Sequence, residues 1–328
     1  MDLDEALEIR PGGIPRGAAV LVTDEVDASG AWLISHLLRR ALVSAAAGSD
    51  DADASRRARV GVSSASQPPG RVCLVTAEQP ASHYTRTLAK LGRDARADLA
   101  TGRLVVVDLL SPLPLDAVAA DANEDKNAPG RGDTDIDRDL APARALFRAI
   151  ARALDRPTRG AEAERGAARA EKTSAATENA ETRDEDEARD VVVVDDVHAA
   201  LASVRVPARS MAAAVDALVR SLLALETEAR PRGGTAVVAG AHLDAAGARA
   251  QAPGGWLFAL NAAADARLDV AALRTGAARD VHGRVRVTHR TGRLARGDGE
   301  MRRRASAKFR LAETGVHATR ERLRDAPS

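Results

Sequence analysis

Short apolar runs without polar alternation recur along the chain, and the stretches between them carry apolar residues at helical spacing. Such runs are typical of strands that are buried on both faces of a mostly parallel sheet. The pattern predicts strands at Ala18–Thr23, Val72–Ala77, Leu104–Leu110, Val191–Val194 and Thr235–Ala241. It predicts helices at Ser29–Ala45, Ala81–Leu91, Pro142–Leu154 and Arg209–Glu228. Alternating strands and helices indicate an α/β fold with right-handed crossovers.

The C-terminal third has a different pattern, because polar and apolar residues alternate in Arg267–Val270, Gly283–His289 and Ala307–Leu311. Alternation of this kind predicts antiparallel strands with one wetter face, which would extend the sheet. A strongly basic connection, Arg290–Arg304, joins the last two of these strands.

Three stretches lack the periodic pattern and are nearly free of large apolar residues: 46–70, 115–141 and 156–189. They cannot bury enough surface to offset the entropy of ordering the chain, so they are predicted to be flexible insertions. The remaining residues suffice for one domain, and we therefore expect a single domain over 1–328.

The turn after the first strand has the place of a phosphate-binding loop but not its residues. A working loop follows G-x-x-x-x-G-K-[ST], with glycines, a lysine and a hydroxyl for phosphates and magnesium. If Gly30 takes the second glycine place, Glu25, Ala31 and Trp32 fall on the first glycine, the lysine and the hydroxyl. None of the four lysines in the chain follows a glycine. The sequence thus predicts an ATPase-like fold without an intact Walker A motif, and no cofactor.

The strand Val191–Val194 ends in Asp195 and Asp196, which is the form of a Walker B strand. In an ATPase such a carboxylate would hold a magnesium-bound water. Because the loop that would bring the nucleotide is degenerate, we expect no metal here and an interface or vestigial role for the two acids.

Other candidate residues have plainer explanations. His83 and Tyr84 begin a predicted helix, where Ser82 would be the cap and the two rings would serve packing or an interface. His282 precedes a strand and is predicted to be structural or part of an interface, and Trp256 and Phe258 are expected to be core or interface anchors. Dinucleotide, zinc and metalloprotease motifs are absent from the sequence.

Charge is balanced overall, at +1, so a preference for nucleic acid must be local. Residues 279–328 hold fourteen Arg or Lys against six acids, a ribbon that could contact RNA phosphates. The candidate RNA contacts are Arg290, Arg293, Arg296, Arg302, Arg303 and Arg304. The only aromatic residue in this region is Phe309, which does not favour base stacking.

The single cysteine, Cys73, lies in an apolar strand and predicts a buried thiol in a reducing compartment. The sequence shows neither a secretory signal nor an apolar run long enough to span a bilayer. We expect a cytoplasmic protein without membrane contact, and a nuclear location is also open.

Several short motifs in this order resemble the family of Elongator complex protein six. They are Asp24–Gly30 after the first strand, Ser35–Leu38, Val72–Val75, Ser82–Tyr84, Lys90–Gly92, Gly102–Val105, Val191–Asp196 and, most specifically, Arg279-Asp280-Val281-His282-Gly283. The likeness extends over nearly the whole chain outside the three predicted insertions, whose length and composition depart from the family pattern.

The resemblance implies a RecA-like domain without Walker A that is not an enzyme. It implies a heterohexameric ring with Elongator subunits four and five, contact with the larger Elongator subunits, tRNA binding by the ring, and support of wobble-uridine modification. Two alternatives remain open from the residues: a divergent RecA- or clock-type ATPase using Asp195 or Asp196, and a stand-alone RNA-binding module built on the basic C-terminal hairpin.

Overall fold

The computed structural model describes residues 14, 17–25, 27–47, 70–111, 118, 120, 134–155, 190–225, 235–243, 250–273, 281–289, 304–312 and 315–321. Within them, nine strands form one sheet in the order β3-β2-β4-β5-β1-β6-β7-β8-β9. The strands are β1 Ala19–Glu25, β2 Arg71–Thr76, β3 Leu104–Asp108, β4 Asp190–Val194, β5 Ala236–Leu243, β6 Ala266–Ala271, β7 Gly283–His289, β8 Arg304–Ala312 and β9 Gly315–Glu321. The helices are α2 Ala31–Ala47, α4 Ala81–Lys90, α5 Ala95–Ala100, α7 Asp135–Asp155, α9 Val197–Ser203, α10 Met211–Leu223 and α12 Trp256–Ala263, with a 3-10 turn η1 at Ala208–Ser210.

The sheet has a parallel part and an antiparallel extension. Strands β3, β2, β4, β5, β1 and β6 pair in parallel, whereas β7, β8 and β9 continue the sheet through antiparallel pairs. This confirms the predicted mixed α/β class. One strand, β5, lies between β1 and the Walker B-like strand β4.

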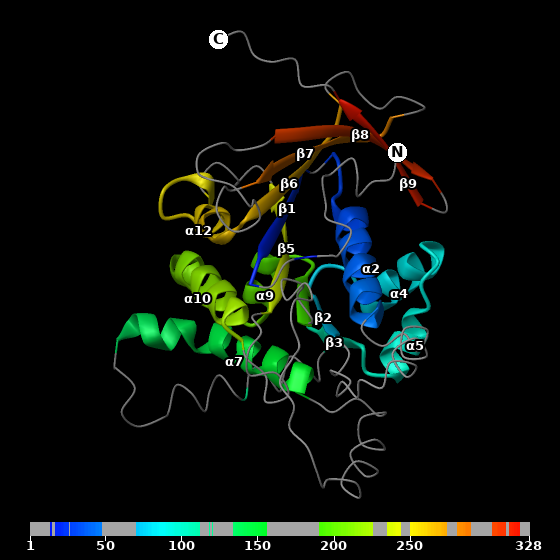
Figure 1. Ribbon diagram of the computed structural model, residues 1–328. Coiled ribbons are helices and arrows are strands. Elements are labelled where there is room, and N and C mark those ends of the chain that lie inside the picture. The colour runs from blue at the N-terminus through cyan, green and yellow to red at the C-terminus, as the bar shows by residue number, and fades with distance from the viewer. Residues whose placement is uncertain are drawn as a thin grey trace, which may run out of the picture.

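Both faces of the parallel part are covered by helices (Figure 1). The consecutive valines of β4 show why the strand is apolar throughout, because Val191 and Val193 join the core under α2 and α4. Val192 and Val194 join the opposite core, beneath α7, α9, α10 and α12. Cys73 of β2 lies in that second core, and its burial raises the pKa of the thiol to about 12, as expected for a structural cysteine.

The predicted strands of the parallel part are confirmed, but β6 was assigned the wrong orientation. Residues 267–270 alternate as an antiparallel strand would, yet β6 is parallel to β1 and antiparallel only to β7. Strand β9 and helices α5, α9 and α12 have no counterpart among the elements predicted above.

The predicted insertion boundary at residue 141 is wrong, because α7 begins at Asp135. Thr134 and Asp137 exchange hydrogen bonds across the first turn, where the hydroxyl accepts the Asp137 N–H, as in a capping box. Pro142, predicted as the helix start, lies inside α7.

Val118, also within the predicted insertion 115–141, is buried in the second core. Likewise, α2 continues to Ala47. The other residues of the three predicted insertions lie outside the described residues, except 70 and 120.

Candidate functional site

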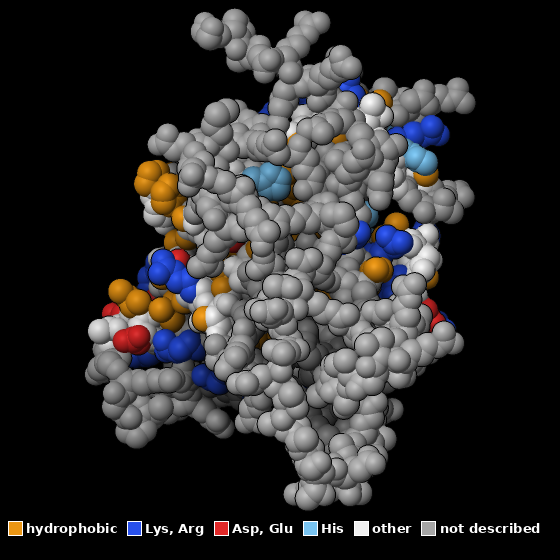
Figure 2. Space-filling model, viewed as in Figure 1, with side chains coloured by type: hydrophobic (Ala, Val, Ile, Leu, Met, Phe, Trp, Pro, Cys, Tyr) orange, Lys and Arg blue, Asp and Glu red, His pale blue; other side chains and the backbone are white. Residues whose placement is uncertain are grey.

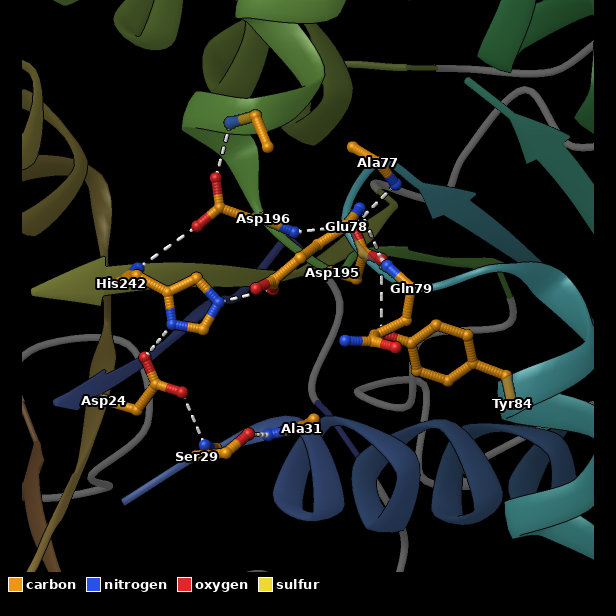
Figure 3. A network of polar contacts seen from close by, with 12 residues as sticks. Asp24, Ser29, Ala31, Ala77, Glu78, Gln79, Tyr84, Asp195, Asp196 and His242 are labelled. Atoms are coloured by element: carbon orange, nitrogen blue, oxygen red, sulfur yellow. Dashed lines mark hydrogen bonds and ion pairs between the residues drawn. The ribbon is translucent and has the colours of Figure 1, made fainter. Parts of the chain in front are cut away.

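The carboxyl ends of β1, β2, β4 and β5 meet at one edge of the sheet, which is where α/β proteins bind their ligands. Polar side chains from all four strand ends gather there in one network (Figure 3). Its main members are Asp24 from β1, Glu78 after β2, Asp195 after β4 and His242 from β5.

Asp24 holds the position at the N-terminus of α2 that a phosphate would need. Its side chain, 4% exposed, accepts the backbone N–H of Gly30 immediately before the helix. Ser29 Oγ accepts the next N–H, from Ala31, at 3.2 Å. The loop is closed further by a bond of 2.9 Å from the Ala28 N–H to the carbonyl of Glu25. The N–H groups of Gly30 and Ala31, at the start of α2, are therefore engaged by the chain's own side chains.

The residues predicted at the degenerate loop lie where the sequence placed them, without phosphate-binding chemistry. Glu25 ends β1 with an exposed side chain, and Ala31 and Trp32 are the first residues of α2. The indole of Trp32 packs against Phe309 of β8, with ring centroids 4.6 Å apart. At the place of the Walker A hydroxyl the chain thus has a packing residue.

His242 joins two carboxylates across the site. Its Nδ1 bonds to Asp24 and its Nε2 to Glu78. The hydrogen bonds to Asp24 and then to Glu78 raise the pKa of this histidine to about 10, and they outweigh the opposing effect of its partial burial. At neutral pH both ring nitrogens therefore donate, and a cation is held between two acids. Sequence reasoning missed His242.

Asp195, the first acid of the Walker B-like strand, is used by the backbone. Its carboxylate accepts the N–H groups of Ala77, Glu78, Gln79 and Asp196, at 2.8 to 3.2 Å. The hydroxyl of Tyr84 donates to the same carboxylate at 3.3 Å. Burial raises the pKa of Asp195 despite these bonds, and burial together with the charge of Asp195 raises the pKa of Tyr84. The carboxylate fixes the loop after β2 and has little capacity left for a metal-bound water.

Asp196 is the N-cap of α9, where it accepts the N–H of Ala199. It also accepts the backbone N–H of His242 at 3.1 Å, and burial raises its pKa. Asp195 and Asp196 therefore both bind backbone N–H groups near the ends of β2, β4 and β5. Their role in an interface stays a prediction.

The remaining predicted residues are separate from this network. His83 packs edge-on against the ring of Tyr84, with centroids 5.4 Å apart, whereas Tyr84 itself is core. Ser82 is not the cap of α4, because the helix begins at Ala81 after Pro80 and has no side-chain cap. His282 accepts the N–H of Leu311 through Nδ1 at 3.0 Å, a structural bond between the start of β7 and the end of β8.

Two more groups of predictions can be located. Arg290, Arg293, Arg296, Arg302 and Arg303 lie outside the described residues, and Arg304 is the first residue of β8. Trp256 is partly buried against His198, at 5.0 Å between ring centroids, and Phe258 is 49% exposed on α12.

A hollow of about 390 Å³ lies beside the N-terminus of α2, between α4 and the β7–β8 end of the sheet. Its lining includes Asp27, Trp32, His83, His282 and Phe309. Among the described residues no group of three or more His, Cys, Asp or Glu is arranged to hold a metal ion. None of the described helices has the length and apolar character needed to cross a bilayer.

The fold is an α/β fold with β5 between β1 and the Walker B-like strand β4. The residues present do not fit the phosphates of a nucleotide, because Asp24 places a carboxylate at the helix N-terminus and the lysine place holds Ala31. No protein-family model and no curated protein matches the chain. Among solved structures, the flagellar accessory protein FlaH of Methanocaldococcus jannaschii is 13% identical with a TM-score of 0.48, covering 97% of this chain and 95% of that one. A KaiC-like protein of Pyrococcus horikoshii is also 13% identical, with a TM-score of 0.43 over 97% and 94% of the two chains. Likeness at this level identifies neither a family nor a function.

Proposed function

We propose that this chain is a non-catalytic subunit of a larger assembly, in which a RecA-like domain contributes packing surfaces and not ATP hydrolysis. The bond from the Gly30 N–H to Asp24 carries the proposal. A helix N-terminus attracts anions through its free N–H groups and its dipole, and here an anion of the chain itself occupies that place.

The other parts of an ATP site are also committed elsewhere. Asp195 accepts four backbone N–H groups. His242, on the neighbouring strand β5, is held between Asp24 and Glu78. A triphosphate entering this edge would meet three carboxylates in the loop, Asp24, Glu25 and Asp27, without a lysine to offset them. For a triphosphate to bind here, the bonds of Asp24 to Gly30 and to His242 would have to break.

The sequence motifs favour one assembly in particular, Elongator, with this chain in the role of subunit six. In that role it would form a ring with subunits four and five, bind the larger Elongator subunits, and support tRNA wobble-uridine modification through tRNA held by the ring. The motif around His282 is the most specific of these. The ring of His282 accepts the N–H of Leu311, a structural role that does not depend on catalysis.

The experiment is affinity purification of the tagged full chain from its native cells, followed by quantitative mass spectrometry. Two further RecA-like proteins at equal stoichiometry, together with large Elongator subunits, are expected. A different stoichiometric complex would retain the assembly role and remove Elongator. Recovery of the chain alone would contradict the assembly role and favour the divergent ATPase.

A measurement of ATP turnover distinguishes the divergent ATPase from the non-catalytic subunit. Purified chain and an Asp195→Asn variant are compared for ATP turnover, and equal background rates are expected. Turnover that the substitution abolishes, in a variant that remains folded, would establish the ATPase and overturn the proposal.

A further inference from the structure

The hollow of about 390 Å³ beside the N-terminus of α2 is separate from the polar network at the strand ends, because neither Asp24 nor His242 lines it. Its volume lies within the range of pockets that bind ligands, about 300–1,000 Å³. Two aromatic residues, Trp32 and Phe309, contribute to its lining. The hollow therefore has the size and the apolar surface of a binding site that is independent of the closed nucleotide site.

The two rings of the lining are held in place by the chain. Trp32 and Phe309 lie 4.6 Å apart between ring centroids, with their planes tilted by 40°. The ring of Phe309 lies so close to Gly283 that a Cβ there would be 2.7 Å from two of its atoms. The backbone N–H of His282 donates to the carbonyl of Phe309 at 2.8 Å. Phe309 is buried, whereas Trp32 is only partly buried, so the indole is the ring that an occupant would contact most.

The described lining carries a negative charge and contains no Arg or Lys. Its one carboxylate belongs to Asp27, whose exposed side chain forms no hydrogen bond or ion pair with the described part of the chain. His282 adds no positive charge, because its Nδ1 accepts the N–H of Leu311 and the ring proton is then on Nε2. An acid beside an aromatic surface thus has no cationic counterpart among the described lining residues.

The basic residues of the adjacent strand β8 face away from the hollow. Lys308 and Arg310 alternate with Phe309 and Leu311, so they lie on the other face of the strand. In Figure 2 basic side chains lie over the β8–β9 hairpin, at the upper right. A cation that enters the hollow would therefore meet Asp27 and the two rings.

An arginine side chain matches these features. Its guanidinium is planar, stacks on aromatic rings and pairs with a carboxylate through parallel N–H donors. Tryptophan is the side chain that attracts a cation most strongly. Asp27 would repel a phosphate or a carboxylate, and an aliphatic side chain would cover this charge without pairing it. Arginine and aromatic residues are also enriched at the energetic centres of protein interfaces, and Leu311, 38% exposed, offers an apolar contact in the same lining.

We propose that the hollow receives an arginine side chain of a partner protein, whose guanidinium stacks on Trp32 and pairs with Asp27. This inference rests on the proposed assembly role, because it specifies a contact that a partner subunit makes. It also gives a use to the sequence motif that ends in His282 and Gly283, since these two residues hold Phe309 in the lining.

The first test is a titration of the full chain, with nitrogen-15-labelled tryptophan, against Nα-acetylarginine amide. The chain has two tryptophans, and Trp256 packs in the core on the other face of the sheet, so its indole signal is an internal reference for that of Trp32. We expect a saturable shift of the Trp32 signal alone, with a dissociation constant in the millimolar range. Nα-acetylcitrulline amide, which has nearly the same shape without the charge, should bind several-fold more weakly.

Two variants locate the charge that binds the probe. Asp27→Asn removes the carboxylate of the hollow and should weaken binding of the arginine probe roughly three- to fivefold. Glu25→Gln is the matched control, because Glu25 is an exposed acid of the same loop that does not line the hollow, and its affinity should stay close to that of the unaltered chain. The absence of a saturable shift, equal binding of the citrulline probe, or equal losses in the two variants would overturn the proposal.

Affinity purification of tagged Asp27→Arg and Glu25→Arg chains from native cells tests whether the cation belongs to a protein. Because like charges would meet in the hollow, recovery of the partner should fall roughly tenfold or more with Asp27→Arg and stay unchanged with Glu25→Arg. A partner retained in full by Asp27→Arg, or lost equally from both variants, would overturn the inference and leave the assembly role intact. An unaltered chain recovered alone, with a probe that still binds, would overturn both and assign the hollow to a free organic cation.

Discussion

The carboxylate of Asp24 accepts the backbone N–H of Gly30 at the N-terminus of α2, where the phosphate loop of an ATPase would place a phosphate. The second oxygen of the same carboxylate bonds to His242. One buried acid thus binds the N–H of Gly30 at the start of α2 and holds a cation on the neighbouring strand. This arrangement explains how a loop without lysine closes and remains stable.

Replacing Asp24 tests the contribution of this contact to stability. Asp24→Asn keeps the size of the side chain but removes the charge that faces His242, and hydrogen bonds to charged groups contribute about 1.5–3 kcal/mol. We expect the free energy of unfolding in urea to fall by about 2 kcal/mol. Asp27→Asn, in the same loop but exposed, is the control and should change it by less than about 0.5 kcal/mol. Equal effects of the two substitutions would contradict this role of Asp24.

The raised pKa of His242 predicts a dependence of stability on pH. A histidine with a pKa of about 10 in the folded chain and 6.5 unfolded contributes stability fully below pH 6.5. The contribution should decline as the pH rises from 6.5 and be lost above about pH 10. The measurement is the difference in unfolding free energy between the unaltered chain and His242→Asn at pH 6, 8 and 10.5, in which titrations common to both cancel. A difference that stays constant over this range would show that the ion pairs do not form.

Asp195 is expected to stabilise the folded chain through its hydrogen bonds. In Asp195→Asn the amide presents one oxygen where the carboxylate presents two acceptors to four backbone N–H groups. Leaving buried N–H groups unsatisfied costs about 1–3 kcal/mol, so the midpoint of urea unfolding should fall clearly. Asp216→Asn, which breaks an exposed ion pair within α10, should cost no more than about 0.5 kcal/mol. An Asp195→Asn chain with unchanged stability would show that the carboxylate of Asp195 does not stabilise the fold.

Gly240 on β5 is required by the close approach of Asp195. A Cβ at this position would lie 1.8 Å from the carbonyl oxygen of Asp195, a backbone atom that cannot move aside alone. Gly240→Ala should therefore destabilise the chain by more than about 3 kcal/mol or prevent folding. At Gly30 a Cβ would meet its neighbours at 3.2 to 3.4 Å, so Gly30→Ala should be milder. The comparison is made by soluble yield and circular dichroism melting, and the reverse order would contradict the geometry.

Much of the fold could be predicted because its signals are local. Four consecutive valines at 191–194 can only be buried on both faces of a sheet, and that is where they lie. The orientation of β6 could not be predicted in this way, because its alternation is the same whether its neighbour is parallel β1 or antiparallel β7. The start of α7 did have a local signal, in Thr134 and Asp137, which the apolar pattern alone did not reveal.

The site was predictable only in part, because its contacts join distant residues. The degenerate loop could be recognised from Glu25, Gly30, Ala31 and Trp32, since a motif is contiguous. His242 could not, because its partners Asp24 and Glu78 are 218 and 164 residues away in the chain. Only the fold brings the ends of β1, β2 and β5 together.

Calorimetric titration of the purified full chain with magnesium ATP tests the closed site most directly, because it needs neither partners nor turnover. We predict no binding heat up to millimolar ATP, and no rise in melting temperature at the same concentration. Stoichiometric binding at micromolar ATP would show that Asp24 yields its place to a phosphate, and the chain would then have to be regarded as a nucleotide-binding subunit.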